Sequence, residues 1–188
     1  MELDFELNIM IATMARDNSI LGQTCFHDMI KEFWIYDKQS YTSVMNNVQR
    51  QTIIFDECLY NLHKSRFRFT AAHELAHWIL HQRFYSNYTS IACRSTNETL
   101  NNRKDYYPKT ADDWTEWQAN QFAAAILLPR NLMDGIVDNF ITGKNLSYEA
   151  FLSDFPYVKE LCEKISSLMD VSKTCALNRM KNIYGIVI

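Results

Sequence analysis

The spacing of hydrophobic and polar residues predicts strands early in the chain and helices later. From Leu3 to Ile11 the odd positions are apolar, whereas positions 4, 6 and 8 are Asp, Glu and Asn. This alternation indicates a strand, although a short helix is compatible with it. Two further runs, EFWIYD (32–37) and QTIIFD (51–56), are rich in aromatic and β-branched residues between polar flanks. We expect both to be strands.

The hydrophobic period then changes to that of helices. Residues 69–82 are apolar nearly all round, which is typical of a buried helix. A second long helix is expected to begin at Thr110 or Asp112, either of which can cap it, and to end just before Pro129. Four shorter helices are expected after it. Between the two long helices, residues 86–113 are polar and lack periodicity, which predicts a functional or disordered loop.

Composition indicates an ordinary globular protein. The chain has 188 residues, of which 47% are hydrophobic and 22% charged, and its simplest organisation is one domain over 1–188. Only 4 Gly and 3 Pro interrupt it, which favours helices over a fold with many turns. The net charge of -3 argues against a nucleic-acid surface built on bulk charge, so no direct nucleic-acid partner is expected.

Cysteine usage and the N-terminal residues both favour the cytoplasm. The cysteines are odd in number and form no CxxC motif, which argues against a disulfide framework or a thiolate zinc site. We expect small buried thiols at Cys25, Cys58, Cys93, Cys162 and Cys175. Acidic Glu2, Asp4 and Glu6 precede any apolar run, unlike the basic start of a signal peptide. No apolar run approaches the ~20 residues of a membrane span, so no membrane partner is expected.

The candidate chemistry lies in RFTAAHELAHWILH (68–81), where three histidines follow one another at intervals of four. Residues at i and i+4 share one face of a helix, so His73 and His77 can direct imidazole nitrogens at one metal ion. Neutral imidazoles suit Zn²⁺. Glu74 projects about 100° round the helix and can reach water at the metal without ligating the metal itself. This is the HExxH motif, in which the glutamate acts as general base.

A catalytic zinc site needs a third protein ligand, for which Glu116 is the first candidate. Glu116 opens EWQANQFAAAILLP (116–129) and precedes a strongly apolar face, where a lone carboxylate would be costly to bury. Asn120 lies one turn further on the same face and could hydrogen-bond a ligating histidine. Spacing alone is equally compatible with a solvated carboxylate at Glu116 and a surface amide at Asn120.

Other polar and aromatic residues near the motif have weaker assignments. His81 is rotated by roughly 80° from His73 around the helix and could be the third ligand if Glu116 is not. Tyr106 or Tyr107 could stabilise an oxyanion if the polar loop folds over the metal. Trp114 and Trp117 are expected to be core anchors.

RFTAAHELAHWILH followed by EWQANQFAAAILLP resembles the ImmA/IrrE family of zinc metallopeptidases. That family reads approximately RFTxAHExxHxxLH and then ExxANxFAxxLLxP. The C-terminal VSKTCALNRMKNIYGIV (171–187) is similar to the family's closing pattern, roughly VSxxAxxxRLxxLGLI. The resemblance implies one Zn²⁺ held by His73, His77 and Glu116 in a gluzincin-like site, with Glu74 as general base. His81 matches a family position that is not a metal ligand.

The resemblance also implies an α+β fold, a compact zincin-like metallopeptidase domain with a small sheet beside the HExxH helix and the glutamate helix. The zinc-site core would occupy about residues 50–130, followed by a helical C-terminal part over 131–188. Better-known family members cleave helix-turn-helix repressors of mobile elements or stress-response genes. The implied function is therefore a zinc endopeptidase with a specific protein substrate, such as a DNA-binding repressor.

The sequence departs from the family pattern in two places, and two other functions are compatible with it. The family's leading helix is hard to recognise in residues 1–22, and the polar segment 86–113 is long. One rival is a non-catalytic metal-bearing scaffold that binds a regulator protein, and the other is a DNA-associated regulator. The intact Glu74 favours a peptidase over a scaffold, since a scaffold needs no base. The net charge of -3 counts against the DNA-associated regulator.

Overall fold

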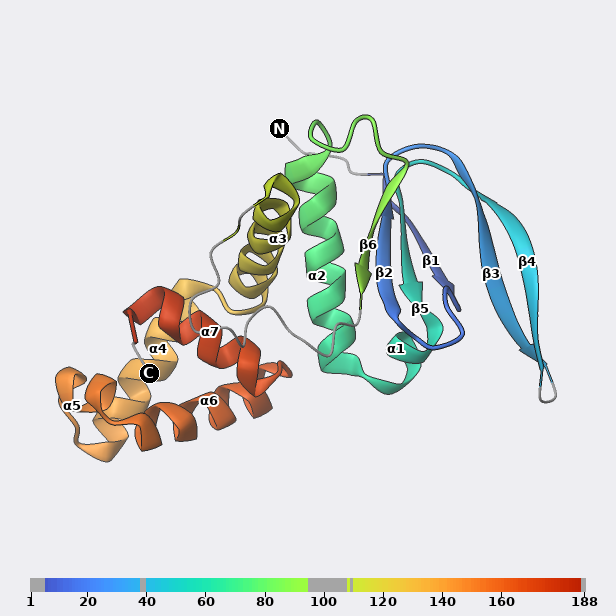
Figure 1. Cartoon of the computed structure of the whole chain (residues 1–188). Coiled ribbons are helices and arrows are strands. Elements are labelled where there is room, and N and C mark those ends of the chain that lie inside the picture. The colour runs from blue at the N-terminus through green and yellow to red at the C-terminus, as the bar shows by residue number, and fades with distance from the viewer. Residues whose placement is uncertain (1–5, 38–39, 95–107, 109, 187–188) are drawn as a thin grey trace. The chain divides into compact units, whose positions relative to one another are not determined.

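The computed structural model describes the chain except for residues 1–5, 38–39, 95–107, 109 and 187–188, and the side chains at positions 93 and 94. The described residues form six strands and seven helices, which confirms the predicted α+β class (Figure 1). They divide into two compact units, residues 1–120 and 121–188. The expectation of one domain over 1–188 stays a prediction, and each unit is described by itself.

The first unit contains a four-stranded sheet in the order β1-β5-β2-β6. Strand β1 pairs in parallel with β5, whereas β2 pairs antiparallel with both β5 and β6. Every residue of β5 is buried, as its β-branched and aromatic sequence TIIFD leads one to expect. The strands are β1 Asn8–Ala12, β2 Ile20–Cys25, β5 Thr52–Asp56 and β6 Ser90–Arg94.

A separate two-stranded ribbon, β3 Met29–Asp37 and β4 Ser40–Val48, completes the β structure of this unit. The ribbon is antiparallel, with Met29 opposite Val48 at its base. Its base joins the core through a cluster of buried side chains: Met14, Cys25, Phe33, Val48 and Ile54. An isolated bridge between Thr13 and Trp34 is the point at which β3 meets the chain just after β1.

Two consecutive helices, α1 Glu57–Leu62 and α2 Lys64–His81, follow the central strand. The side chain of Asp56 caps α1 by accepting hydrogen bonds from the backbone N–H groups of Cys58 and Leu59, at 3.0 and 3.2 Å. Helix α2 carries the HExxH motif and packs against β2 of the sheet (Figure 1). The sheet therefore sets the position of the motif residues on that side.

Helix α3, Ala111–Leu127, begins in the first unit and ends in the second. Thr110 and Asp113 form a reciprocal cap at its start. The Thr110 hydroxyl accepts from the Asp113 N–H at 3.1 Å, and the Asp113 carboxylate accepts from the Thr110 N–H at 2.9 Å. This cap confirms Thr110 as the start of the second long helix.

The second unit is helical, as predicted for the residues after Pro129. Its helices are α4 Arg130–Lys144, α5 Tyr148–Ser153, α6 Phe155–Met169 and α7 Lys173–Tyr184. Their core is apolar and fully buried at Phe151, Val158, Leu161, Ile165 and Met180. Arg179 donates from Nε to the carbonyl oxygen of Leu128 at 2.9 Å, so α7 is tied to the end of α3 within this unit.

Several sequence predictions are confirmed, and others are wrong. Strand β1 confirms a strand at residues 8–11 of the predicted segment, but its faces are the reverse of those that the alternation indicates. Ile9 and Ile11 are exposed, whereas Met10 is half-buried. EFWIYD lies in β3, and QTIIFD lies in β5 from Thr52 onward. Strands β2 and β4 were not predicted. The loop prediction for 86–113 is wrong at residues 90–94, which form the edge strand β6, and 95–107 lies outside the described residues. Residues 90–94 read SIACR, which has a single β-branched residue and no regular alternation of apolar and polar positions, so the sequence carries little strand signal there.

The prediction that Trp114 and Trp117 anchor the core is also wrong. Their exposed fractions are 45% and 40%, and their rings contact each other edge to face at 5.6 Å between centroids. The cysteine prediction is confirmed at Cys25, Cys162 and Cys175, which are buried and free, whereas Cys58 is half-buried. In the described part of the chain, no helix has the length and apolar character needed to cross a bilayer.

Candidate metal centre

The two motif histidines lie one turn apart on α2 and point the same way. His73 and His77 are almost fully buried, with exposed fractions of 3% and 1%. Their Nε2 atoms lie 3.0 Å apart. This is the arrangement expected from i and i+4 positions on one face of a helix.

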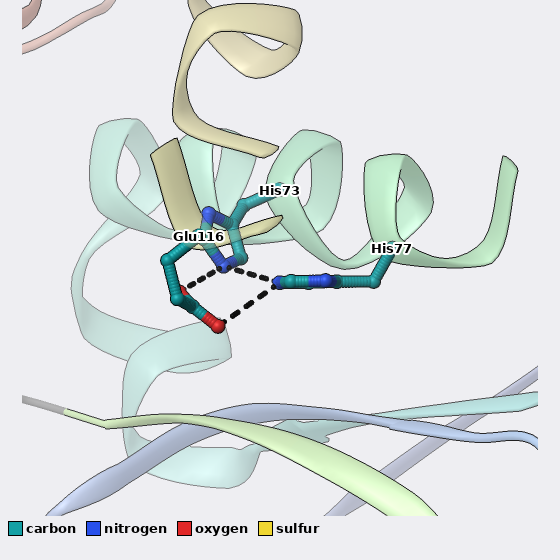
Figure 2. A group of neighbouring side chains, drawn as sticks. All are labelled: His73, His77 and Glu116. Atoms are coloured by element: carbon teal, nitrogen blue, oxygen red, sulfur yellow. Dashed lines mark hydrogen bonds and ion pairs between the residues drawn. The ribbon is translucent and has the colours of Figure 1, made fainter. Parts of the chain in front are cut away.

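The side chain of Glu116, on α3, points toward the imidazoles of His73 and His77 (Figure 2). Its Oε2 lies 3.3 Å from Nε2 of His73, and its Oε1 lies 3.3 Å from Nε2 of His77. One donor atom from each of the three residues falls within 4.8 Å of the other two. The structure thus brings together all three residues predicted as ligands, while their role as ligands stays a prediction.

Asn120 fixes the tautomer of His73. Its amide oxygen lies 3.1 Å from Nδ1 of His73. A carbonyl oxygen only accepts, so Nδ1 of His73 must carry the proton, and Nε2 of the neutral ring keeps a lone pair. Asn120, one turn beyond Glu116, thus contacts the imidazole of His73, and its role beside a metal ligand stays a prediction.

His81 fixes the tautomer of His77 in the same way, through a short chain of hydrogen bonds that ends at Gln118. Nε2 of His81 donates to the amide oxygen of Gln118 at 3.0 Å, which leaves Nδ1 of the neutral His81 ring as an acceptor. Nδ1 of His77 lies 3.0 Å from that acceptor and donates to it. Burial lowers the pKa of His81, which favours this neutral form. His81 thus contacts the side of His77 away from Glu116 and does not take the position of a third ligand.

The donor set suits a small divalent cation. With both Nδ1 atoms protonated, two nitrogen lone pairs and a carboxylate face one another, an arrangement that a positive charge between them would relieve. Four-coordinate zinc, with bonds of about 2.0–2.1 Å, holds neighbouring ligand atoms about 3.3 Å apart. The separations between Nε2 and carboxylate atoms are 3.3 Å, and that between the two Nε2 atoms is 3.0 Å. Two nitrogens and one oxygen also match the ligand chemistry of Zn²⁺.

The electrostatics of the three residues agree with this fit. Burial alone would raise the pKa of Glu116, but its contacts with the imidazoles of His73 and His77, which donate to it when their Nε2 atoms are protonated, hold that pKa well below its ordinary range, so the carboxylate is ionised. Burial disfavours protonation of His73, yet the carboxylates of Glu116 and Glu74 outweigh it and raise its pKa. Burial lowers the pKa of His77 despite its contact with Glu116. The site therefore attracts positive charge while keeping one imidazole neutral.

Glu74 is held on the sheet side of α2, away from the bulk solvent. It is fully buried. The hydroxyl of Thr24 on β2 lies 2.6 Å from its Oε2 and 3.0 Å from its backbone carbonyl oxygen. This hydroxyl fixes the orientation of the carboxylate, whose charge reaches His73 closely enough to raise that pKa. Glu74 does not contribute an atom to the cluster of His73, His77 and Glu116.

Gly22, also on β2, provides the space that Glu74 occupies. A Cβ atom at position 22 would lie 2.9 Å from Cγ and 2.9 Å from Oε1 of Glu74, and 2.9 Å from Cγ2 of Thr70. Real Cβ atoms do not approach neighbours so closely. Any larger side chain would therefore displace the carboxylate or separate β2 from α2.

We predict that Gly22→Ala destabilises the fold by about 1–3 kcal/mol, because the extra methyl group overpacks a buried contact. The matched control is Gly135→Ala in α4, where an added Cβ meets no atom within 4 Å. That change should stabilise the chain by up to about 1 kcal/mol through helix propensity. Denaturant unfolding of both variants measures the two effects, and equal or same-sign shifts would contradict the close packing at Gly22.

Sequence reasoning missed the residues that support the cluster. Gly22 and Thr24 lie in a strand that the hydrophobic pattern did not indicate, and their only signal would have been the polar run GQT within an otherwise apolar segment. Gln118 lies between Glu116 and Asn120 but was not considered, because its role depends on the orientation of His81. Tyr106 and Tyr107 lie outside the described residues.

Comparison with protein-family models matches residues 37–181 to a peptidase family described as the IrrE N-terminal-like domain. The match covers more than half of the chain and includes His73, Glu74, His77 and Glu116. Comparison with curated proteins found no match.

Proposed function

Since the chain belongs to the peptidase family of the IrrE N-terminal-like domain, as its resemblance to ImmA/IrrE proteins predicted, we propose that it is a zinc-dependent endopeptidase with one specific protein substrate. Membership of this family makes a metallopeptidase-like activity the general expectation. The finer assignments of metal, catalytic residues and substrate are our proposal.

One observation carries the proposal: donor atoms of His73, His77 and Glu116 converge within 4.8 Å of one another. These residues would hold the zinc ion through two Nε2 atoms and a carboxylate. When bound, Zn²⁺ supplies Lewis-acid chemistry, which polarises a carbonyl group and makes water a stronger acid. Asn120 and His81 keep the two imidazoles in the tautomer that leaves Nε2 available.

Glu74 would carry the proton during hydrolysis. Its carboxylate takes a proton from a water molecule while the water oxygen attacks the carbonyl carbon of the scissile peptide bond. The protonated Glu74 then donates that proton to the amide nitrogen, and the C–N bond breaks. The two fragments leave as a carboxylic acid and an amine, between which the remaining proton passes to give a carboxylate and an ammonium group. Thr24 keeps the carboxylate oriented through both transfers by its hydrogen bond at 2.6 Å.

The proposed substrate is a helix-turn-helix transcriptional repressor of a mobile element or a stress response, cut in the cytoplasm. Support comes from the family resemblance, because better-known relatives act on such repressors. The test is to incubate the purified zinc-loaded protein with the repressor encoded beside its gene and to follow fragments by mass spectrometry. Cleavage at one bond supports the proposal. Stable binding without cleavage would instead favour the metal-bearing scaffold.

We predict that Asn120→Ala weakens zinc binding by about 10–100-fold, the usual cost of removing a hydrogen-bond partner of a ligating histidine. Gln121→Ala is the matched control on the same helix, because its amide oxygen accepts from Asn182 rather than from a motif histidine. Competition titrations with a zinc-sensitive dye measure both affinities. Equal affinities in the two variants would show that Asn120 does not orient His73.

A further inference from the structure

A groove of about 620 Å³ lies between strands β1 and β3, in the first unit. Its walls are residues 10–13, at the end of β1 and just after it, and residues 33–36 of β3, with Asn46 and Glu57 also lining it. Its volume falls in the range of about 300–1,000 Å³ that is usual for binding sites. We propose that this groove binds an extended segment of a partner protein, which adds a strand between β1 and β3 and places a basic side chain at Glu57.

The backbone of β1 presents unused hydrogen-bonding groups to the groove. Asn8 donates to the carbonyl oxygen of Gln51 on the β5 side, at 2.8 Å. In a parallel pair alternate residues point to opposite edges of the strand, so Asn8, Met10 and Ala12 face β5. Ile9 and Ile11 therefore direct their N–H and C=O groups away from β5. The carbonyl of Thr13 follows the same parity and accepts from the N–H of Trp34 at 2.9 Å.

The edge of β3 faces the same space. The N–H of Trp34 points to Thr13 and therefore away from β4. By the alternation of an antiparallel pair, the backbone groups of Tyr36 also point away from β4. Continuing the Thr13–Trp34 bridge would place Ile11 opposite Tyr36, yet among the described residues the bridge stops at Thr13 and Trp34. The edges of β1 and β3 are thus joined by the Trp34–Thr13 hydrogen bond, and the strands separate beyond it.

The edge of β1 lacks the features that usually protect a sheet edge from pairing. Strand β1 reads NIMIA, without a charge, proline or glycine. Ile9 is 70% exposed, Ile11 is 38% exposed and Tyr36 is 64% exposed. Exposed apolar edges of this kind favour the addition of another strand. An extended peptide could pair with the free backbone groups of the groove and also cover its exposed apolar side chains.

Charge complementarity favours a foreign segment over a second copy of this chain. Among the described residues that line the groove, Glu57 is the only charged one, and its Oε2 accepts from the hydroxyl of Thr13 at 3.1 Å. A bound segment with Lys or Arg opposite Glu57 would form an ion pair there. The exposed edge of β1 in a second copy has no basic residue to offer. Both walls precede residue 37, where the family match begins, so they lie in the part that the match does not cover.

The test uses the full-length chain carrying Glu74→Gln, so that a bound peptide is not cut, and a capped heptapeptide of alternating Thr and Val with one central Lys. Amide chemical shifts report binding at individual residues. We expect the largest changes at Ile11 and Tyr36. N-methylation of alternate peptide residues on one edge should weaken binding at least about tenfold, since several backbone hydrogen bonds are lost together.

Proline variants separate backbone pairing from side-chain contact. Tyr36→Pro removes an N–H that faces the groove and leaves the β3–β4 hydrogen bonds in place, whereas Tyr36→Ala keeps that N–H. Tyr36→Pro should bind the peptide about 5- to 10-fold more weakly than Tyr36→Ala, with equal melting temperature and zinc content. Ile11→Pro and Ile11→Ala form the same matched pair on β1. Glu57→Gln should weaken binding of the Lys peptide but not of its Gln counterpart.

Three results would overturn the proposal. The first is the absence of shifts at Ile11 and Tyr36 at millimolar peptide. The second is equal binding by the proline and alanine variants. The third is a concentration-dependent dimer that Ile11→Pro dissociates, since a second copy would then occupy the edge. None of these results depends on peptidase activity, so the groove and the proposed function fail or succeed separately.

Discussion

Replacing Glu74 by Gln should lower peptide cleavage by about 10²-fold or more, the lower range for losing acid–base catalysis, while zinc stays bound at near wild-type affinity. The change keeps the size of the side chain and an oxygen that can accept the hydrogen bond from Thr24, at 2.6 Å in the wild type. It removes only the capacity to take a proton. Because Glu74 contributes no atom to the ligand cluster, its loss should not release the metal.

The matched control is Glu149→Gln, an exposed carboxylate in the first turn of α5 that should behave as the wild type. Zinc content, melting temperature and cleavage of the repressor proposed as substrate are measured on both. Wild-type cleavage by Glu74→Gln would end the peptidase assignment and leave the binding scaffold as the better reading. Loss of cleavage together with an early melt would point to folding damage rather than to a missing base.

Glu116→Gln should have the opposite pattern, losing zinc first and activity with it. It exchanges an ionised carboxylate, 3.3 Å from Nε2 of each of His73 and His77, for a neutral and weakly coordinating amide. Removing the partner of a ligand costs about 10–100-fold in affinity, so we expect removal of the ligand itself to cost more than about 100-fold. Zinc titration measures this directly. Normal zinc binding by Glu116→Gln would mean that the third ligand is wrongly assigned.

The comparison of the two variants is more informative than either alone. Both change one glutamate to glutamine, and both act within one compact unit of the chain. A catalytic metal site predicts that one variant holds zinc and is inactive, whereas the other loses zinc. If the two glutamates only stabilised the fold, the variants would melt early together and differ little in zinc content.

Most of the helices could be predicted from the sequence because they have strong local signals, although α1 was not predicted and α2 begins at Lys64, before the expected start at residue 69. The buried face of α2, the cap at Thr110 and the stop at Pro129 are local features that tertiary structure did not override. Strand β2 gave no such signal. Its buried Gln23 and Thr24 are polar because they bond to partners 67 and 50 residues away in sequence, Ser90 and Glu74. A pattern of neighbouring residues cannot reveal such partners.

The site shows the same division between local and distant contacts. The pairing of His73 with His77 follows from helical spacing alone, whereas the approach of Glu116 required the family resemblance, since nothing in its own helix specifies α2 as neighbour. The role of His81 was open because it depends on Gln118, from a different helix. Trp114 and Trp117 were misjudged for a related reason. Large aromatic residues usually lie inside, and only the fold shows that this face of α3 is exposed.

The most direct test of the account is zinc X-ray absorption spectroscopy on the full-length chain after reconstitution with zinc. We predict about one zinc per chain and a first shell of nitrogen and oxygen atoms at about 2.0–2.1 Å, with the signature of two imidazoles and no sulfur. This shell would correspond to His73, His77 and Glu116, whose donor atoms lie within 4.8 Å of one another. A protein that binds no zinc, or a sulfur shell at about 2.3 Å from cysteine ligands, would contradict the account.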